Sequence, residues 1–529
     1  MNIMLFLVAC VILLCVLVEK FSDKFGMPAL IFFMFIGMIF GSDGIMKIPF
    51  DDFRMAENIC SIALIFIMFY GGFNTKWQAA KEVAGKSILL STVGVFMTAI
   101  VTMCLCNWVL HMPLGESFLI GAVLSSTDAA SVFAILRKNK LNLKDGTASI
   151  LEVESGSNDP VSYLLTIVAV SVVNTGGFGN VFTTIVLQLL VGIAAGIVLA
   201  KLTLYILTRT HLVAEGLDTI FMISAVLICY ALTAVLKGNA YLSVYLFGLV
   251  AGNHRIRNKQ NIISFFDGVT SLAQILIFFL IGLLTFPHQM PAIVPQAFCI
   301  VLFLTVVARP LAVFVLLKPL KCSFRQCLLI AWAGLRGASS SVFAIMAVAA
   351  GVSMKEELFH IVFMVSLFSA AIQGTLLPRV AVKLDMVDEN ADVRKTFNDY
   401  QEEIAFQLMK LHIPDGHKWV NREIKDVTMP TGSLALMIKR KDESIITRGD
   451  TLILAGDDMI LSVPPYSSDK NEKLQEREIG KNDAWCNKAI EELRVPNHKI
   501  IAMIIRGQET IIPDGKTVIR EHDIVVLYG

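Results

Sequence analysis

The sequence has few charged residues for its length. Asp, Glu, Lys and Arg make up 17% of its 529 residues and 55% are hydrophobic, whereas soluble domains are about 25% charged. The charges are concentrated in the tail, while long apolar runs fill residues 1–384. This distribution excludes a single soluble domain, and the lack of a basic stripe counts against nucleic-acid binding.

Several functional motifs are also missing. No Gly-x-Gly-x-x-Gly follows an expected strand in the tail, so NAD binding is not supported and no cofactor is expected. A Thr-Val-Gly-Tyr-Gly filter of the potassium-channel kind is absent. Ser155 has no nearby His to activate it as a nucleophile. These absences count against an ion channel and against an enzyme.

The ten cysteines are scattered, most of them within apolar runs, and are interpreted as small buried hydrophobic residues. Cys104 and Cys106 have too few ligand-type neighbours for a metal site. The N-terminus lacks the basic stretch of a signal peptide, so the first apolar run is expected to be a retained membrane helix.

The apolar runs of residues 1–384 predict an all-α polytopic membrane domain. A bilayer core needs about 20 apolar residues per helix, and the runs give about thirteen spans, some short enough to be broken helices. After the odd-numbered spans lie Lys20, Lys24, Lys76, Lys81, Lys86, Arg137, Lys138, Lys140, Lys144, Arg209, Arg255, Arg257, Lys259, Lys318, Lys321 and Arg325; after the even ones lie Lys47, Arg54, Lys237 and Lys355. Because cytoplasmic loops collect basic residues, we expect the N-terminus outside and the tail in the cytoplasm.

An internal repeat links the fifth span to the twelfth. The segment Ser131–Ile135 recurs in identical form as Ser341–Ile345, and small residues precede both copies. The two spans run in opposite directions across the membrane. Paired Gly- and Ser-interrupted spans in oppositely oriented halves predict inverted repeats with broken helices, as in secondary transporters.

A second repeat lies in the polar tail. Residues 424–457 align without gaps on residues 490–523, and both copies end in alternating apolar residues that predict strands. We expect a small α+β cytoplasmic domain made of a connector at 385–401, a first unit at 402–463, a linker at 464–481 and a shorter second unit at 482–529.

Ionisable residues cluster at the start of the sixth span. Ser155 and Asp159 are four residues apart and share one face of a helix. A hydroxyl and a carboxylate are oxygen ligands suited to an alkali cation, and a buried aspartate can instead hold a proton because burial makes its charged form costly. A group that binds either a proton or a cation is itself an exchange device. The alternative is that Asp159 only caps a helix before Pro160.

Further buried charges surround this motif. Thr127 and Asp128 lie in the small-residue stretch of span 5, where Asp128 fits the neutraliser of a half-helix N-terminus. Arg336, at the equivalent break in span 12, fits the neutraliser of carbonyl ends or a partner for Glu154. Arg309 is interpreted as structural.

These residues resemble the monovalent cation:proton antiporter-1 family of the NhaP type, through Thr127-Asp128, the Glu-Ser-x-x-Asn-Asp string 154–159 and the Arg of a broken span 12. The resemblance implies that Asp159 binds the cation or proton and that Ser155 and Thr127 help to ligate it. It also implies that Asn158 marks the electroneutral branch, and that the protein is a homodimer with a moving six-helix core.

One departure and the tail bear on the choice of ion. Many sodium-exchanging relatives carry an acidic residue near the end of span 3, but residues 69–74 here contain no carboxylate. The unit at 402–463 resembles the TrkA-C half of regulators of potassium conductance, which implies a regulatory role. Its ligand, whether a nucleotide, an ion or another effector at residues 402–529, stays open.

The sequence therefore predicts an electroneutral potassium/proton antiporter of the plasma (bacterial inner) membrane. It would work by alternating access, with competition at Asp159, and its cytoplasmic tail would regulate it. We keep two alternatives open: a sodium/proton antiporter of the same mechanism, and a cation channel gated by the tail. The expected partners are membrane lipid and a second copy of the chain.

Overall fold

The computed structural model divides the chain into two compact units, Met1–Tyr400 and Gln401–Gly529. It describes residues 2–25, 28–139, 141–175, 177, 181–210, 212–214, 216–254, 256, 258–352, 354–388, 407–427, 429, 433–440, 443–463, 474–480, 485–486, 488–493, 500–506, 509–511, 515, 517–521 and 523–528. Most of the expected connector, and the basic loop residues Lys140, Arg255 and Arg257, lie outside these residues.

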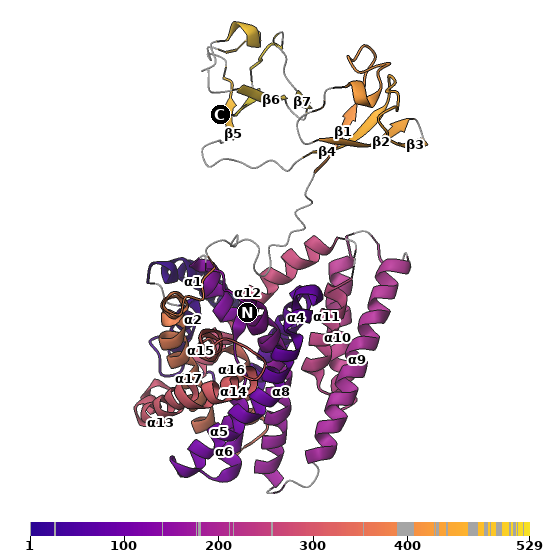
Figure 1. Ribbon diagram of the computed structural model, residues 1–529. Coiled ribbons are helices and arrows are strands. Elements are labelled where there is room, and N and C mark those ends of the chain that lie inside the picture. Colours follow the sequence, from indigo (N-terminus) through magenta and orange to yellow (C-terminus); the bar gives the residue numbers. More distant parts are fainter. Residues whose placement is uncertain are drawn as a thin grey trace. The chain divides into compact units, whose positions relative to one another are not determined.

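The regular elements described in the first unit are helices (Figure 1). Its first half contains α1 Asn2–Phe25, α2 Ala29–Phe40, α3 Phe53–Asn74, α4 Trp77–Leu89, the π-helical turn η1 Leu90–Gly94, α5 Val95–Trp108, α6 Leu114–Val123, α7 Ala129–Lys138, α8 Thr147–Thr175 and α9 Val181–Arg209. Its second half contains α10 Asp218–Val235, α11 Ala240–Gly252, α12 Lys259–Leu283, η2 Pro287–Gln289, α13 Met290–Phe303, η3 Leu304–Ala308, α14 Arg309–Leu317, α15 Phe324–Trp332, α16 Ala338–Ala349, α17 Lys355–Phe368, η4 Ser369–Gly374 and α18 Thr375–Lys383.

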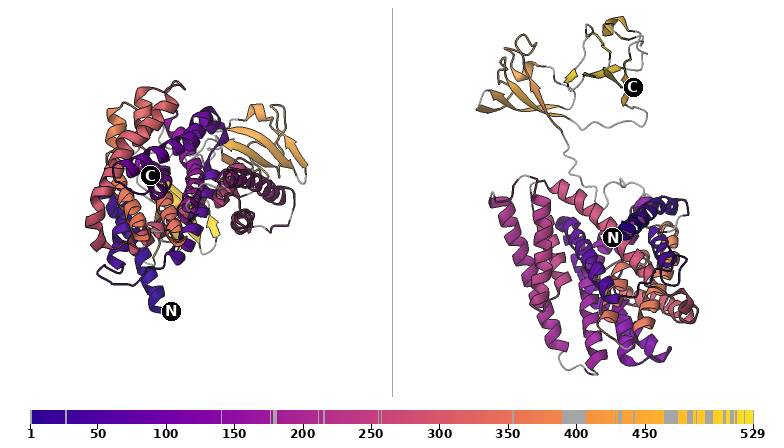
Figure 2. Two further views of the ribbon diagram at one scale, coloured as in Figure 1. Left: turned by 90° about the horizontal axis from the view of Figure 1, so that it is seen from below. Right: turned by 180° about the vertical axis from the view of Figure 1, so that it is seen from behind.

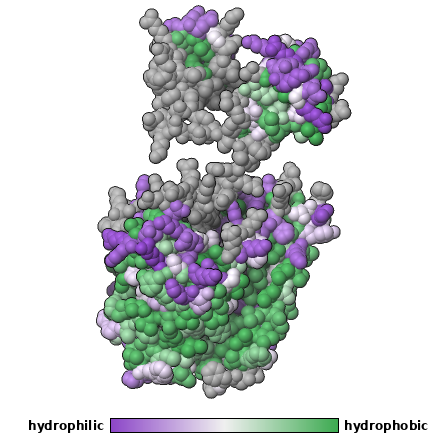
Figure 3. Space-filling model, viewed as in Figure 1, coloured by the Kyte–Doolittle hydropathy of each residue, from purple (hydrophilic) through white to green (hydrophobic). Residues whose placement is uncertain are grey.

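The expectation of a polytopic helical membrane domain is confirmed. Among the described residues, seven helical segments are long and apolar enough to cross a membrane, and shorter apolar helices lie between them. Each expected span has a helical counterpart, counting α4–η1–α5, α13–η3–α14 and α17–η4–α18 as continuous rods. Figure 3 shows hydrophobic residues over most of the side of this unit, as contact with lipid requires.

The two expected broken helices are present. The first consists of α6 and α7, separated by Leu124–Asp128, and the second of α15 and α16, separated by Ala333–Gly337. The non-helical stretches meet, because the Asp128 amide donates to the Leu335 carbonyl at 2.8 Å. Non-helical backbone at this depth is tolerated only where it is enclosed by protein, and Ser125, Ser126 and Leu335 are all about 1% exposed.

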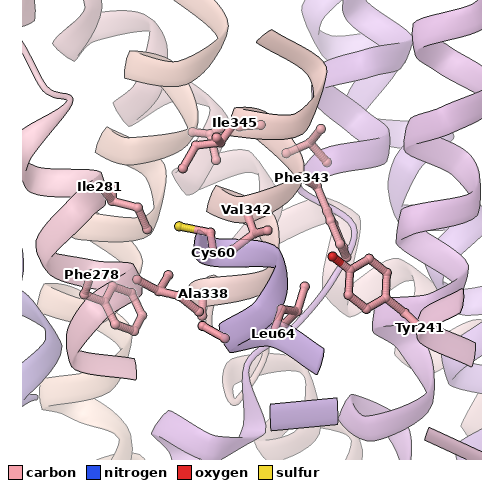
Figure 4. Close-up of a cluster of buried hydrophobic side chains, with 14 of the residues drawn as sticks. Cys60, Leu64, Tyr241, Phe278, Ile281, Ala338, Val342, Phe343 and Ile345 are labelled. Carbon is pink, nitrogen blue, oxygen red and sulfur yellow. The ribbon is translucent and has the colours of Figure 1, made fainter. Parts of the chain in front are cut away.

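Glycine lets the helices around this centre approach closely. A Cβ placed on Gly248 of α11 would lie 2.4 Å from the Phe69 carbonyl oxygen of α3. Small residues replace hydrophobic burial as the basis of helix association inside lipid. In Figure 4, Cys60 and Leu64 of α3 lie beside Val342 and Phe343 of α16, in the same hydrophobic core as Phe69.

Two helices stand at the edge of the unit. Both side views show α9 and α10 beside α11, on the far side from α13 (Figures 1 and 2). Only 17% of the apolar window of α9 is buried within the unit. This edge therefore presents apolar side chains such as Leu190 and Val198 outward.

The second unit contains two antiparallel sheets with the same strand order. The first, in the order β1-β4-β2-β3, consists of β1 Gln407–His412, β2 Leu434–Arg440, β3 Glu443–Ile446 and β4 Asp458–Val463. The second, in the order β5-β8-β6-β7, consists of β5 Leu474–Glu478, β6 Ile500–Arg506, β7 Glu509–Ile511 and β8 Ile524–Tyr528. Strand β5 falls inside the range 464–481 that the sequence suggested as a linker, and it pairs with β8.

The two sheets match in detail. Each has a register shift at the same place in its central strand, between Ala435 and Met437 in one and between Ile501 and Met503 in the other. A 3-10 turn, Ile424–Asp426 or Ile490–Glu492, lies at the equivalent point of each. The repeat in the sequence thus corresponds to a repeat in structure.

Candidate functional site

Asp159 lies in the middle of α8 and is 4% exposed. The helix begins at Thr147 and continues through Pro160, so Asp159 does not cap a helix start as the alternative interpretation required. Its carboxylate accepts a hydrogen bond from the Ser126 hydroxyl and another from the Ser339 hydroxyl at 2.6 Å. Ser126 belongs to the first helix break and Ser339 to the first turn of α16, so one carboxylate contacts both broken helices.

The other polar residues of the α8 motif contact Thr127. The Ser155 hydroxyl donates to the Thr127 carbonyl oxygen at 2.8 Å, and the Asn158 side-chain amide donates to the Thr127 hydroxyl at 2.5 Å. The structure therefore places Asp159, Ser155, Asn158 and Thr127 close together. Their side chains contact the non-helical stretch between α6 and α7.

Asp128 lies where two helices begin. It directly precedes α7, and its carboxylate accepts from the Ser131 amide at 3.1 Å and the Ser131 hydroxyl at 2.6 Å. Backbone amides of Ala130 and of Ala338, the first residue of α16, also donate to it. The negative charge thus faces the positive ends of two helix dipoles, an arrangement that stabilises both.

Arg336 lies in the second non-helical stretch, Ala333–Gly337, and contacts the first. Its Nη1 donates to the Ser126 carbonyl at 2.6 Å, and its own backbone amide donates to the Ser369 hydroxyl at 3.0 Å. The side chain is buried. Of the two roles that the sequence left open for Arg336, the contact with a carbonyl beyond the end of α6 is the one observed.

Glu154 pairs with Arg309 instead. Nη2 of Arg309 lies 2.6 Å from Oε1 and 2.7 Å from Oε2 of Glu154, and both side chains are buried. This ion pair joins α8 to the start of α14. Neither residue lines the cavity described next.

A cavity of about 400 Å³ leads to Asp159. Its lining includes Thr127, Asp128, Ser155, Asp159 and Ser339, together with Tyr70 of α3 and Asp267, Thr270, Ser271 and Gln274 of α12. Glu19 and Glu152 also line it, while the lining includes no Lys, Arg or His among the described residues. A cavity with this lining favours cations over anions.

Aromatic residues lie beyond Asp159 on the other side. Tyr163, one turn further along α8, packs against Tyr241 at 4.8 Å and Phe343 at 5.8 Å between ring centroids. Figure 4 shows Tyr241 and Phe343 side by side. The α8 residues that line the cavity are Glu152, Ser155, Gly156 and Asp159, so the cavity ends at Asp159 and does not reach this aromatic cluster.

Sequence reasoning missed three polar residues of the site. Ser126 and Ser339 were seen only as members of small-residue stretches, although they are the hydroxyls that contact Asp159. Asp267 was left at the edge of the tenth span, whereas α12 begins eight residues earlier at Lys259. Its spacing from Thr270, Ser271 and Gln274 places all four on one helix face and was the available signal.

The chain matches two protein families. The family described as Sodium/hydrogen exchanger, transmembrane, matches residues 8–383. The TrkA-C domain family matches residues 408–470 and again residues 474–529. The two TrkA-C matches correspond to the two sheets of the second unit.

Several named antiporters are similar to this chain over most of their own length. The K(+)/H(+) antiporter NhaP2 of Shewanella baltica (strain OS223) is 31% identical over 84% of this chain and 77% of its own. The K(+)/H(+) antiporter NhaP of Alkalimonas amylolytica is 30% identical over 87% and 81%. The Na(+)/H(+) antiporter 1 of Methanocaldococcus jannaschii is 26% identical over 62% and 79%.

A solved structure has the same fold. The sodium proton antiporter MjNhaP1 from Methanocaldococcus jannaschii at pH 8 superposes with a TM-score of 0.64 and 23% sequence identity. The match covers 73% of this chain and 99% of that one. The helical arrangement of the first unit is therefore that of a known transporter fold.

Proposed function

Because the chain belongs to the sodium/hydrogen exchanger family and is a cation/proton antiporter rather than an enzyme, we propose that it exchanges potassium for protons one for one at Asp159. The observation that carries the proposal is the position of Asp159. Its carboxylate lies at the closed end of an acidic cavity, between the hydroxyls of Ser126 and Ser339.

Exchange follows from competition at this carboxylate. With a proton bound, Asp159 is neutral and offers little attraction to a cation. Once the proton leaves, the carboxylate attracts a cation, and the Ser155 and Thr127 oxygens that line the same cavity replace part of its hydration shell. Because one negative charge cannot hold both, each passage across the membrane carries either one proton or one cation.

The neighbouring charges support a one-for-one ratio. Asp128 is balanced by two helix N-termini, and Glu154 by Arg309. Asn158 beside Asp159 is an amide and cannot titrate. Asp159 is thus the group at the cavity end whose charge is free to change, so the loaded site has the same net charge with either ion and the exchange is electroneutral.

The cavity supports an inward-facing state. Asn74 and Glu152, which line it, lie at the same helix ends as the loops that carry Lys76 and Lys144, and Glu19, which also lines it, precedes Lys20 in the C-terminal part of α1. Basic loops are cytoplasmic, so we place this opening, and the tail, in the cytoplasm of a bacterial inner membrane, with the N-terminus outside.

Alternating access would open the opposite side. The aromatic contacts of Tyr163 and Phe343 with Tyr241 connect α8 and α16 to α11 and close the outer route. We propose that α8 and the broken helices move as one body against α3, α11 and α12, and that two copies of the chain form the working unit. Lipid would surround each copy.

Two observations favour potassium. The relatives that match most of this chain at 30–31% identity are named as potassium/proton antiporters. No carboxylate occurs at residues 69–74, the end of α3 that lines the cavity. The alternative is sodium/proton exchange, which the name of the Methanocaldococcus jannaschii relative favours.

The tail would act as a regulator. Both of its sheets match the TrkA-C family, and we propose that residues 402–529 bind a small effector, such as a nucleotide or an ion, that changes the transport rate. The proposed tail units keep the boundaries 402–463 and 482–529, with strand β5 added to the second. Transport needs no cofactor in this scheme.

Proteoliposomes with an internal pH dye test the function. Potassium, sodium and an impermeant cation are added in turn across an imposed pH gradient, with Asp159→Asn as the matched variant and valinomycin to clamp the voltage. We expect potassium to dissipate the gradient, Asp159→Asn to abolish the effect and the clamp to leave the rate unchanged. Normal transport by Asp159→Asn would overturn the assignment, sodium acting alone would favour the alternative, and flux without proton movement would indicate a channel.

A further inference from the structure

Asp267 is a carboxylate that the exchange cycle at Asp159 does not use. It lies in α12, eight residues or about 12 Å of helix from Lys259, and it lines the same cavity as Asp159. Its side chain is exposed, although α12 is long and apolar enough to cross a membrane. Ionisable residues within such helices usually have a function.

Its surroundings hold the carboxylate in place without neutralising it. The Tyr70 hydroxyl of α3 donates to Oδ1 at 2.9 Å. The phenol carries no charge, and the cavity lining around Asp267 includes no basic residue among those described. The negative charge of Asp267 therefore remains available to a cation.

A hydroxyl one turn away can complete the contact. Thr270 lines the same cavity, and its Oγ1 is buried without a hydrogen-bond partner among the described residues. Buried hydroxyls normally have a partner. Asp267, Thr270 and Gln274 share one face of α12, so a carboxylate and neutral oxygens follow each other along the cavity wall.

We propose that Asp267, positioned by Tyr70 and assisted by Thr270, is an entry station that captures the monovalent cation before it reaches Asp159. This inference rests on the proposed function and adds a second residue that contacts the transported ion. The cation first replaces part of its hydration shell at Asp267, on the part of the lining that comes from α3 and α12. It then crosses the cavity to Asp159, where it competes with the proton.

Steady-state transport by the full-length protein in proteoliposomes tests the station. Asp267→Asn removes the charge and keeps the shape, so the half-saturating potassium concentration should rise about three- to tenfold while the maximal rate is retained. The difference in half-saturating potassium concentration between Asp267→Asn and the unmodified protein should become smaller at 1 M impermeant salt, where the Debye length falls to about 3 Å. Thr270→Val and Tyr70→Phe should raise the half-saturating potassium concentration by less. Asp267→Glu keeps the charge, so its half-saturating concentration should be close to that of the unmodified protein.

The matched control is Asp145→Asn. Asp145 is an exposed aspartate in a basic loop, outside the cavity lining, and its φ of 58° is tolerated by asparagine. If Asp267→Asn and Asp145→Asn have the same half-saturating potassium concentration, the entry station is overturned while exchange at Asp159 is not. If the unmodified protein shows no proton-coupled potassium flux, the proposed function and this inference are both overturned. If Asp267→Asn fails to accumulate, unchanged half-saturation in both Tyr70→Phe and Thr270→Val overturns the station.

Discussion

Arg309 and Glu154 form an ion pair inside the membrane unit, with one guanidinium nitrogen within 2.7 Å of both carboxylate oxygens. The two side chains are 3% and 1% exposed. Arg336 lies close enough to repel Arg309 electrostatically. Glu154 therefore balances a concentration of positive charge beside the transport site.

Removing one member of this pair should destabilise the protein strongly. Glu154→Gln leaves Arg309 buried without its counter-ion, and we expect a loss of about 3–5 kcal/mol in unfolding free energy. The double variant Glu154→Leu with Arg309→Met leaves no unpaired charge and should recover most of that loss. The midpoint of thermal unfolding in detergent measures the loss in Glu154→Gln and the recovery in the double variant. Equal midpoints for these two variants and the unmodified protein would show that the ion pair does not contribute to stability.

A glycine at the helix crossing should be irreplaceable. A Cβ on Gly337 would lie 1.9 Å from Oδ2 of Asp128, so Gly337→Ala must displace the carboxylate from the N-termini of α7 and α16. We expect a lower unfolding midpoint and a loss of at least about tenfold in transport rate.

Gly85 provides the control for that substitution. It lies in α4 with no other atom within 4 Å of an added Cβ, and alanine in a helix interior is about 0.5–1 kcal/mol more favourable than glycine. Gly85→Ala should therefore transport normally and unfold no earlier. If Gly337→Ala behaves in the same way, the close contact with Asp128 is not needed.

The general plan of the membrane unit could be predicted because each element leaves a local signal. Apolar runs and the basic loops locate the spans, and the repeated Ser-Val-Phe-Ala-Ile segment locates the broken helices. Side-chain partners leave no such signal. Arg336 was the possible partner named for Glu154, and Arg309 was given only a structural role. The crossing of the two breaks brings Arg336 to the Ser126 carbonyl, and Glu154 pairs with Arg309 instead.

The part of the cavity lining that comes from α12 was harder to infer. Asp267 breaks an apolar run, so the pattern placed it outside the membrane span, although it lies within α12 and lines a cavity formed by residues of several helices. In the tail, β5 is a polar and charged strand, Leu474–Glu478, whose partner β8 lies about 50 residues later. Long-range pairing of this kind cannot be read from local composition.

Acid should loosen both sheets of the tail. The Arg440 guanidinium holds the pKa of Asp457 below its ordinary value, and Arg506 does the same for Asp523. A carboxyl whose pKa is lowered by folding stabilises the folded state above its unfolded pKa of about 3.9, and this stability is lost as the pH falls through the lower folded value. Asp457 is 0% exposed and bonded to two nitrogens of Arg440, so its contribution is about 1.5–3 kcal/mol.

Hydrogen exchange of the full-length protein measures this effect sheet by sheet. At pH 7, Asp457→Asn should raise exchange in β2 and β4 and leave β6 and β8 unchanged, and Asp523→Asn should do the reverse. The difference in hydrogen-exchange protection between each variant and the unmodified protein should become smaller as the pH falls below about 4. Equal protection in all three proteins at pH 7 would show that neither ion pair stabilises its sheet.

The hydroxyl of Ser339 should matter for cation binding where that of its neighbour does not. Ser339 donates to Asp159 at 2.6 Å, whereas the Ser340 hydroxyl is buried with no hydrogen-bond partner among the described residues. Ser339→Ala removes a bond to a charged group and an oxygen beside the cation, so the half-saturating potassium concentration should rise about tenfold. Ser340→Ala removes an atom of the same kind one residue away and should leave transport unchanged, because it leaves no partner unsatisfied. Initial rates of proton movement at a series of potassium concentrations compare the two, and equal effects would mean that Asp159 does not depend on its contact with α16.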